Sequence, residues 1–299
     1  MRMFHVDAFT ANPLGGNPAT VVLDADDLDE ARMRAIAREF AHAECAFVGR
    51  PGTPDEDVTI RFFNSRKEAP FVGHATLAAH AALLAAGRRP PGRARQRCGI
   101  GIVEVDVRRD ARTSDGTPTI EFRRPAPRLE APLALKTALR VAEALGLPGE
   151  RLHDALPARA CRDGGARLLI PLADAAALEP LAPRTEPLLA LGRELGVDGF
   201  FPFAFRREAA GAVSESRMFC PAIGIPEDPV SGNAHAMLAT YLLEAALLSP
   251  ADPGFVGLQG RHLGRAGRVE IRWDLEAGRA AAVRIGGHAV IIGEGTLTV

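Results

Sequence analysis

Two segments of this chain repeat one pattern, and this repeat constrains the fold more than any other feature. Residues 68–75 and 227–234 both fit Glu-x-Pro-x-x-Gly-x-Ala, and a run rich in alanine and leucine at helical spacing follows each copy. A strand pattern ending in an Arg-x-Phe triplet precedes each copy, at residues 61–63 and 217–219. The two copies are offset by 159 residues in a chain of 299, which predicts two halves of similar architecture.

Between these landmarks, period-two runs alternate with helical spacing, which predicts a mixed α/β chain. Asp26 or Asp27 is expected to cap a helix that runs to Phe40. The basic, proline-rich residues 123–128 are the expected linker between the halves. The other expected helices are 74–84, 135–145, 183–195 and 233–248, and the expected strands are 3–8, 19–23, 45–48, 58–63, 99–107, 119–122, 167–171, 199–205, 213–219, 269–273, 281–285 and 290–292, with breaks at Gly286, Gly287 and Gly293.

The composition argues against several classes of protein. Lys plus Arg total 36 and Asp plus Glu total 37, which gives a net charge of −1, so broad attraction to nucleic acid or acidic membranes is not expected. The four cysteines lie far apart without a CxxC pair, so neither a zinc site nor a disulfide framework is expected. Without an apolar run of about 18 residues or a leader pattern, the chain is expected to be cytoplasmic.

The repeated glycines stand where a ligand could approach a helix start. Unpaired N–H groups and the positive end of the helix dipole attract carboxylates, and glycine lets the backbone come close to them. Gly73 and Gly232 therefore predict two anion-ready helix starts that could hold one small anionic molecule between the halves. Tight helix packing alone would explain either copy, but the two copies together favour a site.

The residues that differ between the copies are the chemically interesting ones. His74 in the first copy corresponds to Asn233 in the second, and a histidine at a helix start can donate, accept or shuttle protons. Asp228 has no acidic counterpart in the first copy, although an aspartate before a helix is most often a cap. Ser231 lies outside a Gly-x-Ser-x-Gly motif, so a nucleophile elbow is not supported.

Four ordered motifs, at residues 16–19, 44–47, 73–76 and 227–234, resemble the PhzF family of phenazine-biosynthesis isomerases, within the diaminopimelate-epimerase-like superfamily. The closing residues 283–290 with Gly293 also fit the family. The resemblance implies an α/β (α+β) fold of two pseudo-symmetric domains, each a strand-rich half-barrel around a central helix. It places the active site in the cleft between them and implies a homodimer that uses neither a metal nor an organic cofactor. The expected domains are 1–124 with the C-terminal strand 288–299, and 125–287.

The resemblance also implies roles for particular residues. Glu44 corresponds to the acid/base that moves a proton within trans-2,3-dihydro-3-hydroxyanthranilate, and His74 and Asp228 correspond to helpers that orient substrate and proton. Gly73 and Gly232 correspond to backbone donors. The remaining expected substrate-binding residues are Asn17, Ser231 and Asn233.

At two places the sequence differs from related families in ways that bear on the expected reaction. Asn233 replaces a small hydroxyl residue of the isomerase motif, which puts the substrate in question. The epimerase and racemase relatives use two facing thiols, whereas Val72 and Ser231 stand at the corresponding positions here. The leading hypothesis is an isomerase that moves a proton within a small carboxylate-bearing substrate. The alternatives are an epimerase, racemase or lyase on an amino-acid-like substrate, or a non-catalytic binding protein.

Overall fold

The computed structural model describes residues 1–40, 44–110, 116–208, 211–277 and 279–298. The chain forms two compact units, Met1–Arg124 with Gly286–Val299, and Pro125–Ile285. Residues near Pro125 are extended rather than looped, because one strand ends at Pro125 and the next begins at Arg128. Each unit is described below by itself.

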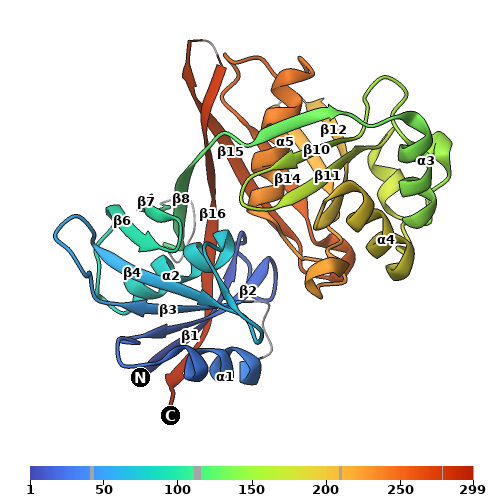
Figure 1. Cartoon of the computed structure of the whole chain (residues 1–299). Coiled ribbons are helices and arrows are strands. Elements are labelled where there is room, and N and C mark those ends of the chain that lie inside the picture. Colours follow the sequence, from blue (N-terminus) through green and yellow to red (C-terminus); the bar gives the residue numbers. More distant parts are fainter. Residues whose placement is uncertain (41–43, 111–115, 209–210, 278, 299) are drawn as a thin grey trace. The chain divides into compact units, whose positions relative to one another are not determined.

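The first unit is a strand-rich sheet wrapped around one buried helix, α2 (Figure 1). Eleven of the thirteen residues of α2 are buried, and the helix packs against β1, β2, β3 and β4. A helix that is apolar on all sides and rich in alanine can be surrounded in this way. The strands follow the order β1 (Arg2–Ala8), β2 (Asn17–Leu23), β3 (Cys45–Gly49), β4 (Val58–Phe63), β6 (Gly92–Cys98), β7 (Gly101–Arg109) and β8 (Pro118–Pro125), β5 (Glu68–Ala69) pairs with β4, and the helices are α1 (Glu30–Phe40) and α2 (Gly73–Ala85).

The second unit repeats this plan around α5, which is also largely buried. Its outer helices α3 and α4 cover an apolar cluster that includes Leu168, Ile170 and Phe200. The strands follow the order β9 (Arg128–Pro132), β10 (Arg159–Arg162), β11 (Ala166–Pro171), β12 (Gly199–Glu208), β13 (Gly211–Ser216), β14 (Phe255–Gln259), β15 (Gly267–Glu276) and the first part of β16 (Arg279–Thr296), which belongs to the first unit from Gly286 on, and the helices are α3 (Leu135–Ala144), α4 (Thr185–Leu195) and α5 (Gly232–Glu244).

Two helical connections of the first unit recur in the second. In the first unit α1 joins the parallel pair β2 and β3, and α2 joins the parallel pair β4 and β6. In the second, α4 joins the parallel pair β11 and β12, and α5 joins the parallel pair β13 and β14. The expected mixed α/β fold, with strands around a central helix in each half, is confirmed.

The C-terminal strand differs from the expectation. β16 runs unbroken for 18 residues, so the predicted breaks at Gly286, Gly287 and Gly293 are wrong. The strand continues because it has a partner along its length: it neighbours β15 and β8, and its end pairs antiparallel with β1. The irregularity near Gly293 is a register shift opposite His5 and Val6, which bends a strand without ending it.

Several other elements were mispredicted. Strands β9, β10 and β14 were missed, and β13 ends at Ser216 instead of residue 219. Asp29, not Asp26 or Asp27, caps α1, since its carboxylate accepts the Arg32 amide at 2.8 Å. Helix α5 ends at Glu244 instead of residue 248, and Ala246 takes a left-handed φ of 54°. β6 was missed because arginines alternate with its inward-facing residues, of which Gln96 is fully buried.

Two histidines inside the units give a prediction about acid. Burial lowers the pKa of His80 to about 4 and the pKa of His235 to about 4, because desolvation disfavours the imidazolium. Both pKa values fall below the unfolded value of about 6.5, so their contribution to stability is complete above pH ~6.5. It is lost as the pH falls from there towards 4, by about 3 kcal/mol for each histidine.

NMR titration of the imidazole Cε1–H signals is expected to find both rings neutral at pH 5.5. Urea unfolding is expected to give a lower free energy of unfolding at pH 5 than at pH 7. A protonated ring in the folded protein at pH 5.5 would contradict the assignment.

Candidate active site

The start of α2 lacks a side-chain cap. Val72, the residue before the helix, is extended and makes no capping hydrogen bond, and Gly73 begins the helix. A Cβ at Gly73 would lie 3.0 Å from the Phe122 ring, so a larger residue at this helix start would require that ring to shift. The first amides of a helix have no partner within the helix, so this end can accept an anion.

Glu44 and His74 face each other beside this helix start. Glu44 directly precedes β3, His74 is the second residue of α2, and Glu44 Oε2 lies 3.6 Å from His74 Nε2. Only 15% of the Glu44 side chain and 10% of the His74 side chain are exposed. The arrangement places a carboxylate and an imidazole, both able to carry a proton, at one partly enclosed point.

The start of α5 contains four of the predicted residues on one short segment. Ser231 caps the helix, because its hydroxyl accepts the Ala234 amide at 3.3 Å. Gly232 and Asn233 occupy the first turn, and the Asp228 amide donates to the Met218 carbonyl at 2.8 Å. Ser231 is thus a capping residue, which is the structural role considered for Asp228 from the sequence.

Asn17 is a buried strand residue. It begins β2, lies opposite Ala8 in the register with β1, and is 1% exposed. Its predicted role in substrate binding stays a prediction.

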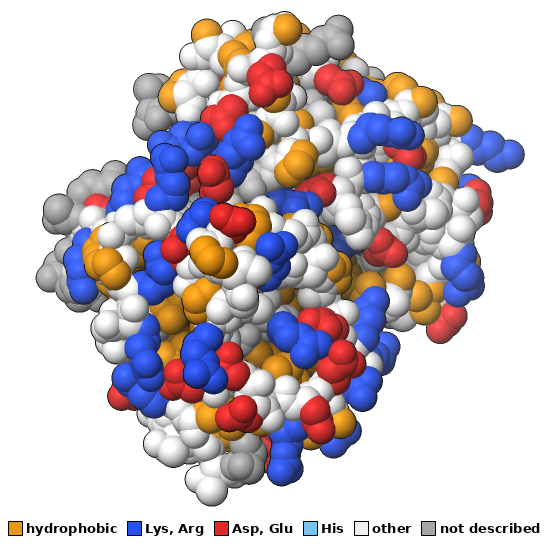
Figure 2. Space-filling view, turned by 60° about the vertical axis from the view of Figure 1, so that its left-hand side comes forward, with side chains coloured by type: hydrophobic (Ala, Val, Ile, Leu, Met, Phe, Trp, Pro, Cys, Tyr) orange, Lys and Arg blue, Asp and Glu red, His pale blue; other side chains and the backbone are white. Residues whose placement is uncertain are grey.

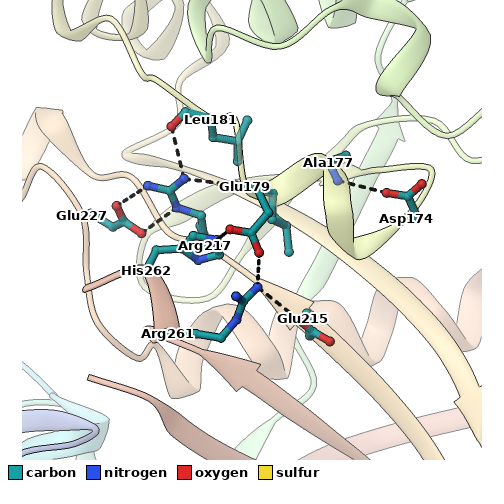
Figure 3. Close-up of polar contacts among 10 residues, drawn as sticks. Asp174, Ala177, Glu179, Leu181, Glu215, Arg217, Glu227, Arg261 and His262 are labelled. Atoms are coloured by element: carbon teal, nitrogen blue, oxygen red, sulfur yellow. Dashed lines mark hydrogen bonds and ion pairs between the residues drawn. The ribbon is translucent and has the colours of Figure 1, made fainter. Parts of the chain in front are cut away.

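An arginine–glutamate clasp holds the segment that leads to α5 (Figure 3). Arg217 Nε donates to Glu227 Oε1 at 2.8 Å, and Arg217 Nη2 donates to Glu227 Oε2 at 2.8 Å. Arg217 Nη1 donates to the Leu178 and Leu181 carbonyls at 3.0 and 3.2 Å. Both charged side chains are nearly buried, at 10% and 12% exposure, so the clasp fixes the residue directly before Asp228.

The first copy of the repeat contains the same clasp in a more exposed form. Arg61 donates to Glu68 at 2.8 and 2.7 Å, and also to Glu30 at 3.0 Å. In both copies the guanidinium lies 5.0 Å from the ring two residues later, which is Phe63 here. About a third of the Arg61 side chain is exposed. The sequence repeat included both arginines and both glutamates, but did not show that they bind each other.

The thiol next to Glu44 is poorly suited to catalysis. Burial raises the pKa of Cys45 to about 12, partly offset by a hydrogen bond with Thr20. At pH 8 only about one thiol in 10⁴ would be ionised, and the thiolate is the reactive form. Native protein treated with iodoacetamide at pH 8 is therefore expected to keep Cys45 unmodified, as measured by peptide mass spectrometry. Alkylation within minutes without unfolding would overturn this prediction.

Charges of both signs are interspersed over the described side chains of the face in Figure 2. Within the described ranges, no group of three or more His, Cys, Asp or Glu side chains is arranged to hold a metal ion. None of the described helices has the length and apolar character needed to cross a membrane.

Comparison with known proteins identifies the family. The family model described as phenazine biosynthesis-like protein, PhzC-PhzF, matches residues 6–295. The chain belongs to this family. The "Uncharacterized isomerase YddE" of Escherichia coli strain K12 is 36% identical over 297 residues, covering 97% of this chain and 96% of that relative. Trans-2,3-dihydro-3-hydroxyanthranilate isomerase of Pseudomonas aeruginosa is 33% identical over 300 residues, covering 98% of each chain.

A solved structure supports the same assignment. The phenazine biosynthesis protein of the PhzF family from Bacillus anthracis matches with a TM-score of 0.85 at 25% identity, covering 100% of this chain and 99% of that one. Relatives that match over nearly the whole length are isomerases, so this PhzF-family chain is an isomerase.

Proposed function

We propose that this PhzF-family isomerase moves a proton within a small carboxylate-bearing substrate, with Glu44 as the acid/base. The observation that carries the proposal is the enclosed pair of Glu44 and His74, 3.6 Å apart at the uncapped start of α2. A carboxylate within reach of a substrate C–H can take the proton and return it to another carbon. The buried, weakly acidic Cys45 argues against a thiol in this role.

In the proposed reaction the atoms of the substrate are conserved. Glu44 takes a proton from one carbon, and the electron pair of that C–H bond shifts into the conjugated system. The protonated Glu44 then gives its proton to a second carbon of the same system. His74, in contact with the Glu44 carboxylate, orients it and steadies its charge between the two steps.

The substrate carboxylate is proposed to bind backbone amides at helix starts. Gly73 and Gly232 are each proposed as donors of such an amide, and Asp228, Ser231 and Asn233 lie beside Gly232 in the chain. Helix-start amides and the helix dipole favour a negative charge without any surplus of basic residues on the protein. Asn17 is also proposed to bind the substrate.

The named relative suggests the first substrate to test. The Pseudomonas aeruginosa relative is a trans-2,3-dihydro-3-hydroxyanthranilate isomerase. Asn233 stands where a small hydroxyl residue is usual in the isomerase motif, and an amide both donates and accepts hydrogen bonds. We therefore propose a substrate that resembles this dihydro-hydroxyanthranilate in its carboxylate and conjugated system, with different substitution near Asn233.

The experiment is proton NMR in deuterated water with trans-2,3-dihydro-3-hydroxyanthranilate and a panel of related unsaturated carboxylates. We expect a product of unchanged composition that carries solvent deuterium at one carbon. Inversion of a stereocentre without rearrangement would indicate an epimerase or racemase, and loss of a group would indicate a lyase. Tight binding without deuterium uptake across the panel would indicate a binding protein. Each of these three results would overturn the proposal.

A further inference from the structure

One side-chain amide bridges both ends of the segment that precedes α5. Gln259, the last residue of β14, donates from Nε2 to the Asp228 carbonyl at 2.6 Å. Its Oε1 accepts the Ser231 amide at 3.0 Å. Gln259 is only 4% exposed, so neither hydrogen bond can be replaced freely by water. The main chain at Asp228 and the main chain at the helix cap are therefore tied to one strand end.

The neighbouring glycine brings the same segment close to β14. Gly260 has a φ of 87°, and a Cβ there would lie 2.7 Å from the Pro229 carbonyl oxygen. The first copy of the repeat has the same approach, since a Cβ at Gly99 would lie 2.8 Å from Pro70 Cα. The strand-end glycine and the proline are thus a shared feature of both units.

The amide bridge is present in only one of the two copies. Cys98, directly before Gly99, occupies the position that Gln259 occupies before Gly260. The Cys98 thiol instead donates to the Gly101 carbonyl at 3.6 Å, within its own turn. The amide bridge is therefore found in the copy that carries Asp228 and Ser231. General packing would explain a feature of both copies, but it does not explain one confined to the chemically distinctive copy.

We propose that Gln259 is a positioning residue for the substrate-binding segment 228–232. By holding the Asp228 carbonyl and the Ser231 amide, it fixes the direction of the Asp228 carboxylate and of the Gly232 amide. The geometric part of the inference stands on the hydrogen bonds alone, whereas the catalytic part rests on the proposed function. Only a side chain with one donor and one acceptor can serve both contacts, which glutamine and protonated glutamate can do.

The test compares Gln259→Met and Gln259→Glu with a matched control, Gln96→Met. Gln96 is a fully buried glutamine of the first unit whose amide bonds the side chains of Thr76 and His80 instead of a main-chain segment. Both methionine variants lose buried amide hydrogen bonds at similar volume. They differ in whether the segment 228–232 loses its anchor.

Amide hydrogen exchange at residues 228–232 tests whether Gln259 holds this segment in place, and the measurement needs no substrate. Gln259→Met is expected to speed exchange at the Ser231 amide about tenfold or more, whereas Gln96→Met leaves that amide unchanged. Unchanged exchange in Gln259→Met, or equal acceleration in both variants, would overturn the proposal. This outcome does not depend on whether the protein is an isomerase.

Turnover of trans-2,3-dihydro-3-hydroxyanthranilate tests whether the positioning by Gln259 contributes to catalysis. Gln259→Met is expected to lower kcat about 10- to 100-fold with a smaller change in KM, and to lower it more than Gln96→Met does. Gln259→Glu is expected to approach wild-type kcat at low pH and to lose it as the pH rises, because the ionised carboxylate would face the Asp228 carbonyl. Normal turnover in Gln259→Met with accelerated exchange would overturn the catalytic part while leaving the proposed function intact. If the wild-type protein turns over none of the panel, the proposed function fails and the exchange result still decides the geometry.

Discussion

Glutamine in place of Glu44 is expected to lower kcat by about 10²- to 10⁴-fold, the range that a positioned acid/base contributes. The amide keeps the size of the side chain and can still contact His74, but it cannot take a proton from carbon. Because the Glu44 side chain is 15% exposed and neutral glutamine needs less solvation, the variant is expected to fold with an unchanged or slightly higher Tm. The measurement is deuterium incorporation by NMR, beside a thermal unfolding curve for the same sample.

The duplication supplies a matched control for this variant. Asp198 directly precedes β12, as Glu44 directly precedes the corresponding strand β3. Its carboxylate accepts a hydrogen bond from the Ala166 amide at 2.9 Å and lies 3.4 Å from Arg167 Nη1. These contacts with nearby residues of the same unit give Asp198 a structural role. Asp198→Asn is expected to keep kcat within about twofold, with a stability loss of about 1 kcal/mol. Full turnover in Glu44→Gln, or equal loss in Asp198→Asn, would end the assignment of Glu44.

Much of the fold could be predicted because its strongest signals are local. The two central helices follow a glycine in a repeated pattern and are apolar on every side, so both their starts and their burial were readable in the sequence. Two of the motifs behind the family resemblance, residues 73–76 and 227–234, lie at these same helix starts. Their spacing of about half a chain then indicated the duplication that the strand order displays.

Two of the errors fall where a distant strand decides the outcome. Glycines usually end a strand, yet Gly286 and Gly293 lie inside β16 because β8 and β1 supply its pairing. β6 is rich in arginine, and only its place under α2 shows that Gln96 faces inward. A single sequence does not reveal which remote segment will provide such hydrogen bonds.

The sequence indicated residues at the helix starts but not the contacts that hold them. Glu44 and His74 lie 30 positions apart in the sequence and 3.6 Å apart in the structure, and their roles stay predictions. Gln259 lies 28 residues beyond Ser231, and no motif joins them, so its contact with the Ser231 amide required coordinates. For the Arg–Glu clasps the signal was present, since an arginine and a glutamate recur at the same places in both copies. A pair that recurs in a duplication predicts a contact.

Methionine in place of Arg217 is expected to lower the free energy of unfolding of the second unit by about 3–5 kcal/mol. The change leaves the nearly buried Glu227 carboxylate without its partner and removes the donor to the Leu178 and Leu181 carbonyls. Trp273, the single tryptophan of the chain, lies on β15 in the second unit, so its fluorescence during urea unfolding reports this unit.

Arg61→Met removes the corresponding clasp of the first unit and is expected to cost less than about 1 kcal/mol, because Arg61 and Glu68 are about one-third exposed and water can solvate what remains. Circular dichroism follows this variant, since the first unit has no tryptophan. The same two residue types, at the same places in a repeat, thus separate the effect of burial from that of charge pairing. Equal losses in the two variants would show that burial does not determine the strength of the clasp.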